Sequence, residues 1–111
     1  MPRVERSTST ISIPIGDWNM KAEETKSVPH KLKLSDIFSV VAMVRNDENT
    51  QKYQAMGVDG GFIQLSIESI DETNINLWRK SGGIFDSTDF DSTEYGRGWV
   101  TIVYSPSGVI Y

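Results

Sequence analysis

The stretch that decides the fold class runs Ile63-Gln64-Leu65-Ser66-Ile67-Glu68, with apolar and polar side chains in alternation. A period of two places every second side chain on the same face of a β-strand. One face of this strand is therefore expected to be buried and the other solvated. The preceding Asp59-Gly60-Gly61 indicates a turn, because aspartate and glycine accept the positive φ of tight hairpins.

The same alternation continues toward the C-terminus. It covers residues 73–78, where Trp78 falls on the polar side of the strand by parity. A last long strand is predicted over residues 99–104, ahead of a turn rich in serine, proline and glycine. Shorter strands at residues 53–56 and 109–111 are left open.

Toward the N-terminus the pattern marks residues 10–15, where Pro14 favours an edge strand. It also marks residues 28–34, in which His30 shares a face with the apolar side chains. Residues 37–44 are nearly all apolar, and their β-branched side chains favour a buried strand over a helix. Residues 20–24 are expected to form at most a single helical turn.

Short strands separated by turns at intervals of about 8–12 residues predict an all-β fold, as a sandwich or a small barrel. We expect a two-layer antiparallel β-sandwich of about six to eight strands with little helix. The 111 residues suit one domain spanning 1–111, with residues 1–8 as the segment where disorder is expected. The predicted core comprises one or two tryptophans together with Ile13, Leu32, Val41, Ile63, Leu65, Ile67, Leu77 and Ile102.

Composition excludes several classes of function. The chain has no cysteine, which excludes disulfides, thiolate metal sites and thiol nucleophiles. With 15 acidic and 11 basic residues its net charge is −4, so binding to nucleic acid is not expected. No apolar run follows the first residues and none reaches the roughly 18 residues of a membrane span. Synthesis in the cytoplasm without membrane insertion is the expectation.

The sequence lacks the residues that catalysis usually needs. Its one histidine, His30, adjoins Pro29 in a predicted strand, where a hydrogen-bonded structural role is favoured. No Gly-x-Ser-x-Gly elbow is present, and the glycine-rich stretches lack the Gly-Lys-Ser/Thr ending of a phosphate-binding loop. We therefore predict that the protein is not an enzyme and uses no cofactor.

The densest group of acids lies in a long predicted loop, residues 81–98, and comprises Asp86, Asp89, Asp91 and Glu94. Four carboxylates make a weak candidate Ca²⁺ site, although the spacing is not that of an EF-hand. A glycosidase pair is a further alternative. The favoured interpretation is a solvated surface loop whose aspartate and serine side chains cap local turns.

Aromatic side chains supply the weak candidates for partner binding, Trp78, Phe90 and Tyr95. An exposed Trp78 would offer a flat stacking face for sugars or a protein contact, whereas a strand covered on both faces would make it core. Phe85, Phe90 and Tyr95 interleave with the acids of the 81–98 loop. They would either pin this loop to the sandwich or present apolar anchors to a neighbour, so the loop is expected to be a mobile surface or part of an interface.

Four segments of the chain resemble a known family, namely residues 15–20, 44–47, 83–92 and 96–104. They are similar to small proteins encoded beside the tail genes of siphophages that infect Gram-positive bacteria, Bacillus included. The resemblance implies a β-sandwich like the N-terminal shoulder domain of lactococcal phage receptor-binding proteins. Those proteins bind saccharide through separate head domains, for which this chain has no residues, so receptor binding does not carry over. No family active-site residues exist to transfer.

The resemblance further implies a structural or adaptor role in the virion, in the tail or adsorption apparatus. Expected partners are other phage tail proteins or a host surface component, and the expected location is the virion after synthesis in the host cytoplasm. The alternative is a small phage-encoded binding protein that acts in the host cytoplasm. A third hypothesis is a carbohydrate hydrolase that uses the acids of the 81–98 loop. Oligomeric state and partner identity are left open.

Overall fold

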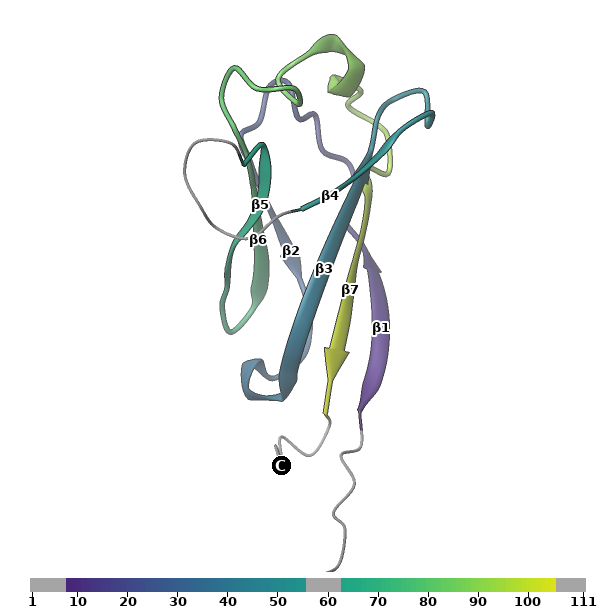
Figure 1. Cartoon of the computed structure of the whole chain (residues 1–111). Coiled ribbons are helices and arrows are strands. Elements are labelled where there is room, and N and C mark those ends of the chain that lie inside the picture. The colour runs from purple at the N-terminus through teal and green to yellow at the C-terminus, as the bar shows by residue number, and fades with distance from the viewer. Residues whose placement is uncertain (1–7, 56–62, 106–111) are drawn as a thin grey trace, which may run out of the picture.

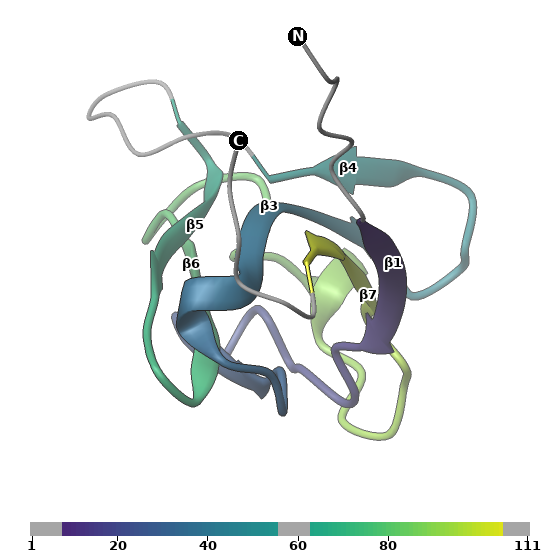
Figure 2. The same cartoon turned by 90° about the horizontal axis from the view of Figure 1, so that it is seen from below.

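A computed structural model describes residues 8–55 and 63–105, which form two antiparallel sheets (Figure 1). The four-stranded sheet has the order β1-β7-β3-β4, from β1 (Ser9–Pro14), β7 (Gly98–Tyr104), β3 (Ile37–Arg45) and β4 (Lys52–Gln54). The three-stranded sheet has the order β2-β6-β5, from β2 (Thr25–Pro29), β6 (Asn74–Arg79) and β5 (Leu65–Ile70). Figure 2 shows the sheets as two separate layers. The predicted all-β sandwich is confirmed.

Most predicted strands are present. The deciding stretch forms β5, which begins two residues later than expected, and the apolar run forms strand β3 and not a helix. Residues 53–56 overlap the short strand β4, and Asn19 accepts a hydrogen bond from the Glu23 amide to close one helical turn. The predictions for residues 1–7, 59–61 and 109–111 lie outside the described residues.

The strand predicted over residues 28–34 is wrong beyond Pro29. Lys31 has a φ of 58°, a left-handed conformation that ends the strand, and a 3-10 turn, η1 (Leu34–Asp36), follows. Leu34 is consequently 40% exposed and does not share the buried face of Val28. The alternating pattern could not predict the end of the strand at Lys31, because lysine is not a residue type that indicates a positive φ.

The core lies between the two sheets. Leu65, Leu77 and Ile102 are buried as predicted, and Ile13, Leu32 and Ile67 pack against them as partly buried side chains. Trp18 supplies the expected tryptophan and is fully buried. Two predictions fail: Val41 is 43% exposed, and Ile63 is half-buried ahead of β5. Val40, Ala42 and Val44 take the inward face of β3, which leaves Val41 on the outer face opposite Thr101.

Two loops complete the core at one end of the sandwich. Trp18 and Met20, in the connection from β1 to β2, are fully buried. From the connection between β6 and β7, Phe85 and Phe90 are also buried and meet Tyr53 of β4 in an edge-to-face cluster. Ring centroids in this cluster are 4.9 to 5.9 Å apart. We call this end the loop end; it comprises residues 15–24, 46–51 and 80–97.

Candidate functional site

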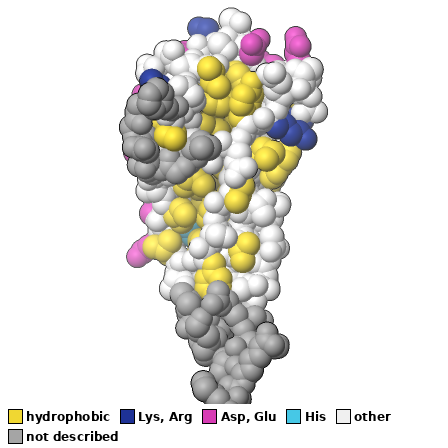
Figure 3. Space-filling model, in the orientation of Figure 1, with side chains coloured by type: hydrophobic (Ala, Val, Ile, Leu, Met, Phe, Trp, Pro, Cys, Tyr) yellow, Lys and Arg dark blue, Asp and Glu magenta, His cyan; other side chains and the backbone are white. Residues whose placement is uncertain are grey.

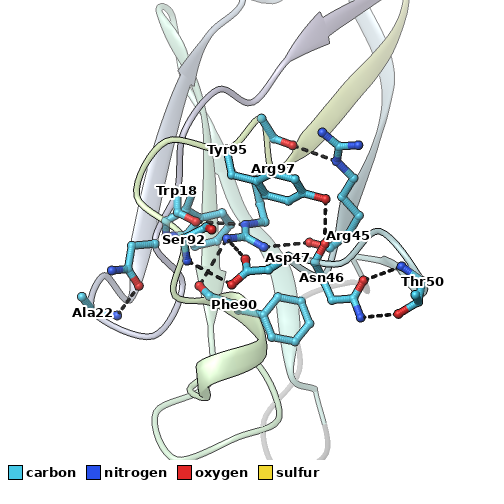
Figure 4. Close-up of polar contacts among 12 residues, drawn as sticks. Trp18, Ala22, Arg45, Asn46, Asp47, Thr50, Phe90, Ser92, Tyr95 and Arg97 are labelled. Atoms are coloured by element: carbon cyan, nitrogen blue, oxygen red, sulfur yellow. Dashed lines mark hydrogen bonds and ion pairs between the residues drawn. The ribbon is translucent and has the colours of Figure 1, made fainter.

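A fully buried arginine holds the loop end together. The Arg97 guanidinium donates from Nε to the Trp18 carbonyl at 2.9 Å and from Nη1 to the Arg45 carbonyl at 2.8 Å. Its Nη2 donates to Asp47 Oδ1 at 2.9 Å and to the Phe90 carbonyl at 3.3 Å (Figure 4). One side chain therefore joins the three loops of this end to the end of β3.

The backbone around Arg97 explains how it reaches the interior. Its amide donates to the Gly16 carbonyl, and its own carbonyl accepts from the Arg45 amide, both at 2.9 Å. The next residue, Gly98, passes so close to β3 that an added Cβ would lie 2.0 Å from the Met43 carbonyl oxygen. Only glycine permits this approach of the chain to β3 directly after Arg97.

Aromatic rings enclose the guanidinium. Arg97 lies 5.0 Å from the Tyr95 ring centroid and 5.5 Å from that of Phe90. On its other side Tyr95 packs against the Arg45 guanidinium at 4.4 Å, and its hydroxyl donates to the Asn46 carbonyl at 2.7 Å. Such cation–π contacts suit arginine because its planar group is weakly hydrated. Tyr95 is thus part of the scaffold and is only half-exposed.

A carboxylate completes the arrangement. Asp47, whose side chain is 19% exposed, pairs with Arg97 through Oδ1 and accepts from the Ser92 amide through Oδ2 at 3.1 Å. Its own amide donates to the Asp89 carbonyl at 2.8 Å. Asp47 therefore neutralises the buried charge and also attaches the 80–97 loop to the loop that follows β3.

A second buried arginine acts in the same way on the opposite sheet. Arg79, at the end of β6, donates from Nε to the Met20 carbonyl at 2.6 Å and from Nη2 to the Lys21 carbonyl at 3.1 Å. Its Nη1 lies 3.7 Å from Asp86 Oδ2. Both sheets thus secure the loop end through a buried guanidinium that donates to backbone carbonyls and pairs with an aspartate.

The four acids proposed for Ca²⁺ do not converge. Asp86 turns toward Arg79 and accepts from the Gly82 amide at 2.9 Å, whereas Asp89, Asp91 and Glu94 are exposed. Within residues 8–55 and 63–105, no three acidic or histidine side chains are grouped so that they could hold a metal ion. Because the 3-10 turn η2 (Thr88–Phe90) directs neighbouring side chains apart, closeness in sequence does not become a shared site.

The three aromatic candidates form no common patch. Phe90 is only 4% exposed, so its prediction as a partner-binding side chain is wrong. Its ring fills the gap beneath the 80–97 loop, the pinning alternative that the sequence left open. Tyr95 is engaged with Asn46 and Arg45, and Trp78 lies half-exposed on the outer face of the other sheet.

His30 has the structural role that was favoured. It is 1% exposed, its Nδ1 accepts from the Leu32 amide at 3.0 Å, and its Nε2 donates to the Asp71 carbonyl at 2.9 Å. Both ring nitrogens are thereby used, so this imidazole is not placed to exchange protons with a substrate. Nearby, a depression of about 500 Å³ is lined by Leu32, Lys33, Leu34, Ser35 and Glu72. It lies at the end of the sandwich opposite the loop end.

Sequence reasoning missed both buried arginines. The signal for Arg97 was its position between two glycines, directly ahead of a strand and as the only basic residue in an acidic loop. That pattern suggests a partner but does not indicate which one, because Asp47 is 50 residues away. Arg79 carried no signal beyond its place on the apolar side of β6 by parity.

The outer surface of the loop end is acidic. Figure 3 shows acidic side chains at the top of the molecule, where these loops lie. In these loops, all of whose residues are described, Lys21 is the exposed basic residue. The exposed acidic residues are more numerous, namely Asp17, Glu23, Glu24, Glu48, Asp89, Asp91 and Glu94.

Comparison with known proteins identifies no relative: the chain matches no protein-family model, no curated protein sequence and no solved structure at a significant level. The resemblance to siphophage tail-region proteins therefore stays a prediction. Among the residues that the structure describes, no helix has the length and apolar character to cross a membrane.

Proposed function

We propose that the chain is a non-enzymatic structural or adaptor module of a bacteriophage tail or adsorption apparatus, and that it contacts its partner through the loop end. The single observation that carries this proposal is the set of hydrogen bonds made by the buried Arg97 guanidinium, which fixes the three loops of the loop end relative to one another. A surface fixed before binding loses less conformational entropy on association, which favours a contact surface. The assignment to a phage rests on the sequence resemblance alone.

The non-enzymatic part of the proposal rests on how the reactive groups are used. Both ring nitrogens of His30 hydrogen-bond to the backbone, and the carboxylates of Asp47 and Asp86 pair with buried arginines. Groups held in this way stabilise the fold and are not available to a reacting substrate.

The charge of the loop end specifies the kind of partner. Exposed carboxylates on this end favour a protein surface rich in lysine and arginine, and charge complementarity of this type acts mainly on the association rate. Association is therefore expected to slow as ionic strength rises, because charges at a protein surface are screened beyond about 8–10 Å.

Mass spectrometry of purified virions tests the tail assignment. The chain should be present in particles of a phage that encodes it, in a fixed ratio to other tail proteins. Its absence from the particles would refute the tail role and favour the alternative, a phage-encoded binding protein of the host cytoplasm.

A matched pair of charge-reversal variants tests the contact surface. Asp89→Lys with Glu94→Lys alters the loop end, whereas Glu68→Lys with Glu72→Lys alters exposed acids elsewhere by the same charge. We expect the first pair to lose co-purification with tail proteins and the second to retain it. Equal loss, or no loss in either, contradicts the assignment of the loop end.

A further inference from the structure

A half-exposed tryptophan lies on the outer face of the three-stranded sheet. Trp78 of β6 is flanked across the strands by Thr25 of β2 and Ser66 of β5. Figure 2 shows this face turned away from the other sheet, with none of the described elements over it. Trp18 donates its indole N–H to the Glu23 carbonyl at 3.0 Å, but within the described residues the Trp78 indole N–H has no hydrogen-bond acceptor. The Trp78 side chain is therefore partly exposed, and its donor is unused among the described residues.

The next row of the same face is a fixed hydrogen-bond network centred on Asn76. The Ser27 hydroxyl donates to Asn76 Oδ1 at 2.8 Å, and Asn76 Nδ2 donates to Ser69 Oγ and to Asp71 Oδ2, both at 3.0 Å. These contacts use both N–H donors and one lone pair of the amide oxygen, and they fix the orientation of the side chain. They leave Ser27 Oγ with lone pairs to accept and the Ser69 hydroxyl with a hydrogen to donate.

This face is polar, and the charged side chains that adjoin its cross-strand rows along β5 and the turn after it are acidic. The cross-strand rows of Trp78, Asn76 and Asn74 contain only neutral side chains, which are Thr25, Ser27, Ser66, Ser69 and Pro29. Two carboxylates adjoin these rows: Glu68, exposed at the bulge in β5, and Asp71, whose Oδ2 accepts from Asn76 Nδ2 at 3.0 Å. Lys80 follows β6 toward the loop end. Ser27 Oγ lies 2.8 Å from Asn76 Oδ1 and Ser69 Oγ lies 3.0 Å from Asn76 Nδ2, so a single side-chain amide bridges the hydroxyls of β2 and β5 and adjoining sugar hydroxyls can reach both.

We propose that the outer face of the β2-β6-β5 sheet binds a neutral oligosaccharide. The Trp78 ring stacks on the C–H face of one sugar, because aromatic rings combine apolar area with a polar N–H at the edge. The Ser27 and Ser69 hydroxyls pair with the hydroxyls of the neighbouring sugar. This inference goes beyond the proposed tail role and does not depend on the loop end.

The composition of the face favours this ligand class over others. Nucleic acid needs clustered Lys and Arg to neutralise phosphates, and this face has none between its ends. The centre of a protein interface is usually apolar, as on the outer face of the other sheet, where Trp99 lies near Met43 and Val41. Hydroxyls, an amide and the carboxylates of Glu68 and Asp71 beside a single aromatic ring suit a neutral ligand rich in hydroxyls, because carboxylates accept hydrogen bonds from hydroxyls and repel anions.

Titration of the purified full-length chain with cellohexaose, maltohexaose and chitohexaose tests the proposal. At least one of these neutral glycans should shift the Trp78 indole signal in nuclear magnetic resonance spectra at millimolar concentration. Trp78→Ala should weaken that binding by about tenfold or more, as truncation of a central aromatic anchor does. Trp78→Phe keeps a stacking ring and should retain most of the affinity.

Trp99→Ala is the matched control, because it removes a half-exposed tryptophan from the opposite face of the sandwich. It should bind as the parent does. Thermal melting establishes that each variant is folded before its affinity is compared. The proposal is overturned if none of the three glycans moves the Trp78 signal, or if Trp78→Ala binds as tightly as the parent. Equal weakening in Trp78→Ala and Trp99→Ala also overturns it. Absence of the chain from virions refutes the tail role and leaves these outcomes unchanged.

Discussion

Replacing Arg97 with methionine should lower the free energy of unfolding by about 3–5 kcal/mol, the range for breaking a buried ion pair from one side. The substitution keeps a long side chain but removes four hydrogen bonds, three to backbone carbonyls and one to Asp47. Each buried acceptor left without a donor costs about 1–3 kcal/mol. The total stays below four times that cost for two reasons. The Phe90 carbonyl keeps the Met20 amide as a donor at 2.9 Å, and Asp47 is partly exposed and can be rehydrated.

Urea unfolding followed by circular dichroism measures this loss, with an unchanged m-value as the check that the transition remains two-state. A loss of this size is a large part of the total stability of a small domain, about 5–15 kcal/mol. Arg97→Lys keeps the charge but replaces the planar guanidinium with a compact ammonium. It should therefore recover only a minor part of the lost free energy of unfolding.

Arg45→Met is the control, since it removes a guanidinium from the same end of the sandwich. Arg45 is half-exposed, donates to the Gly96 carbonyl at 2.9 Å and lies over the Tyr95 ring. Its loss should cost about 1 kcal/mol. An Arg97→Met protein within about 1 kcal/mol of the parent would refute the reasoning, because the buried carbonyls would then be satisfied by other means.

Further predictions concern the core, a close crossing, a turn and the acidic loop. Leu65→Ala should cost about 2–5 kcal/mol in urea unfolding, from lost apolar transfer plus a residual cavity, and unchanged stability would contradict its place in the core. Gly98→Ala should reduce the melting temperature sharply or prevent folding, because its Cβ would meet the Met43 carbonyl oxygen; a parent-like melting temperature is the opposing result. Hydrogen bonds from the Asn74 amide, the Asn76 side chain and the Thr73 amide lower the pKa of Asp71 from 3.8 to about 2. A pKa depressed in the folded state stabilises the protein above the unfolded value of 3.8, and that contribution is lost as pH falls toward about 2. Carboxyl carbon shifts should therefore titrate with a midpoint near 2, and a midpoint at 3.8 or higher would exclude these hydrogen bonds. Millimolar Ca²⁺ should change neither thermal stability nor protease resistance, since the acids of the 80–97 loop do not converge; protection by Ca²⁺ would restore the ion site.

The sequence by itself determined the fold class and most strand positions. Alternation of apolar and polar side chains is a local property, and it located β5, β6 and β7 to within about two residues. It also put Trp78 on the solvent side of β6 by parity. For β3 the apolar run indicated a strand, but a run without alternation carries no information about which face is inward. Val41 was assigned to the core for this reason, and only the pairing of β3 with β7 placed it outside.

The tertiary structure alone decided the organisation of the loop end. Arg97 meets Trp18, Arg45 and Asp47, which are 79, 52 and 50 residues away in the chain. No local pattern encodes such pairings, because they depend on which backbone carbonyls the closed sandwich removes from water. A buried carbonyl must find a donor, and the side chain that reaches it is selected by the path of the whole chain. The acids of the 80–97 loop are the opposite case. They are close together in the sequence, but only the structure shows that they do not converge in space.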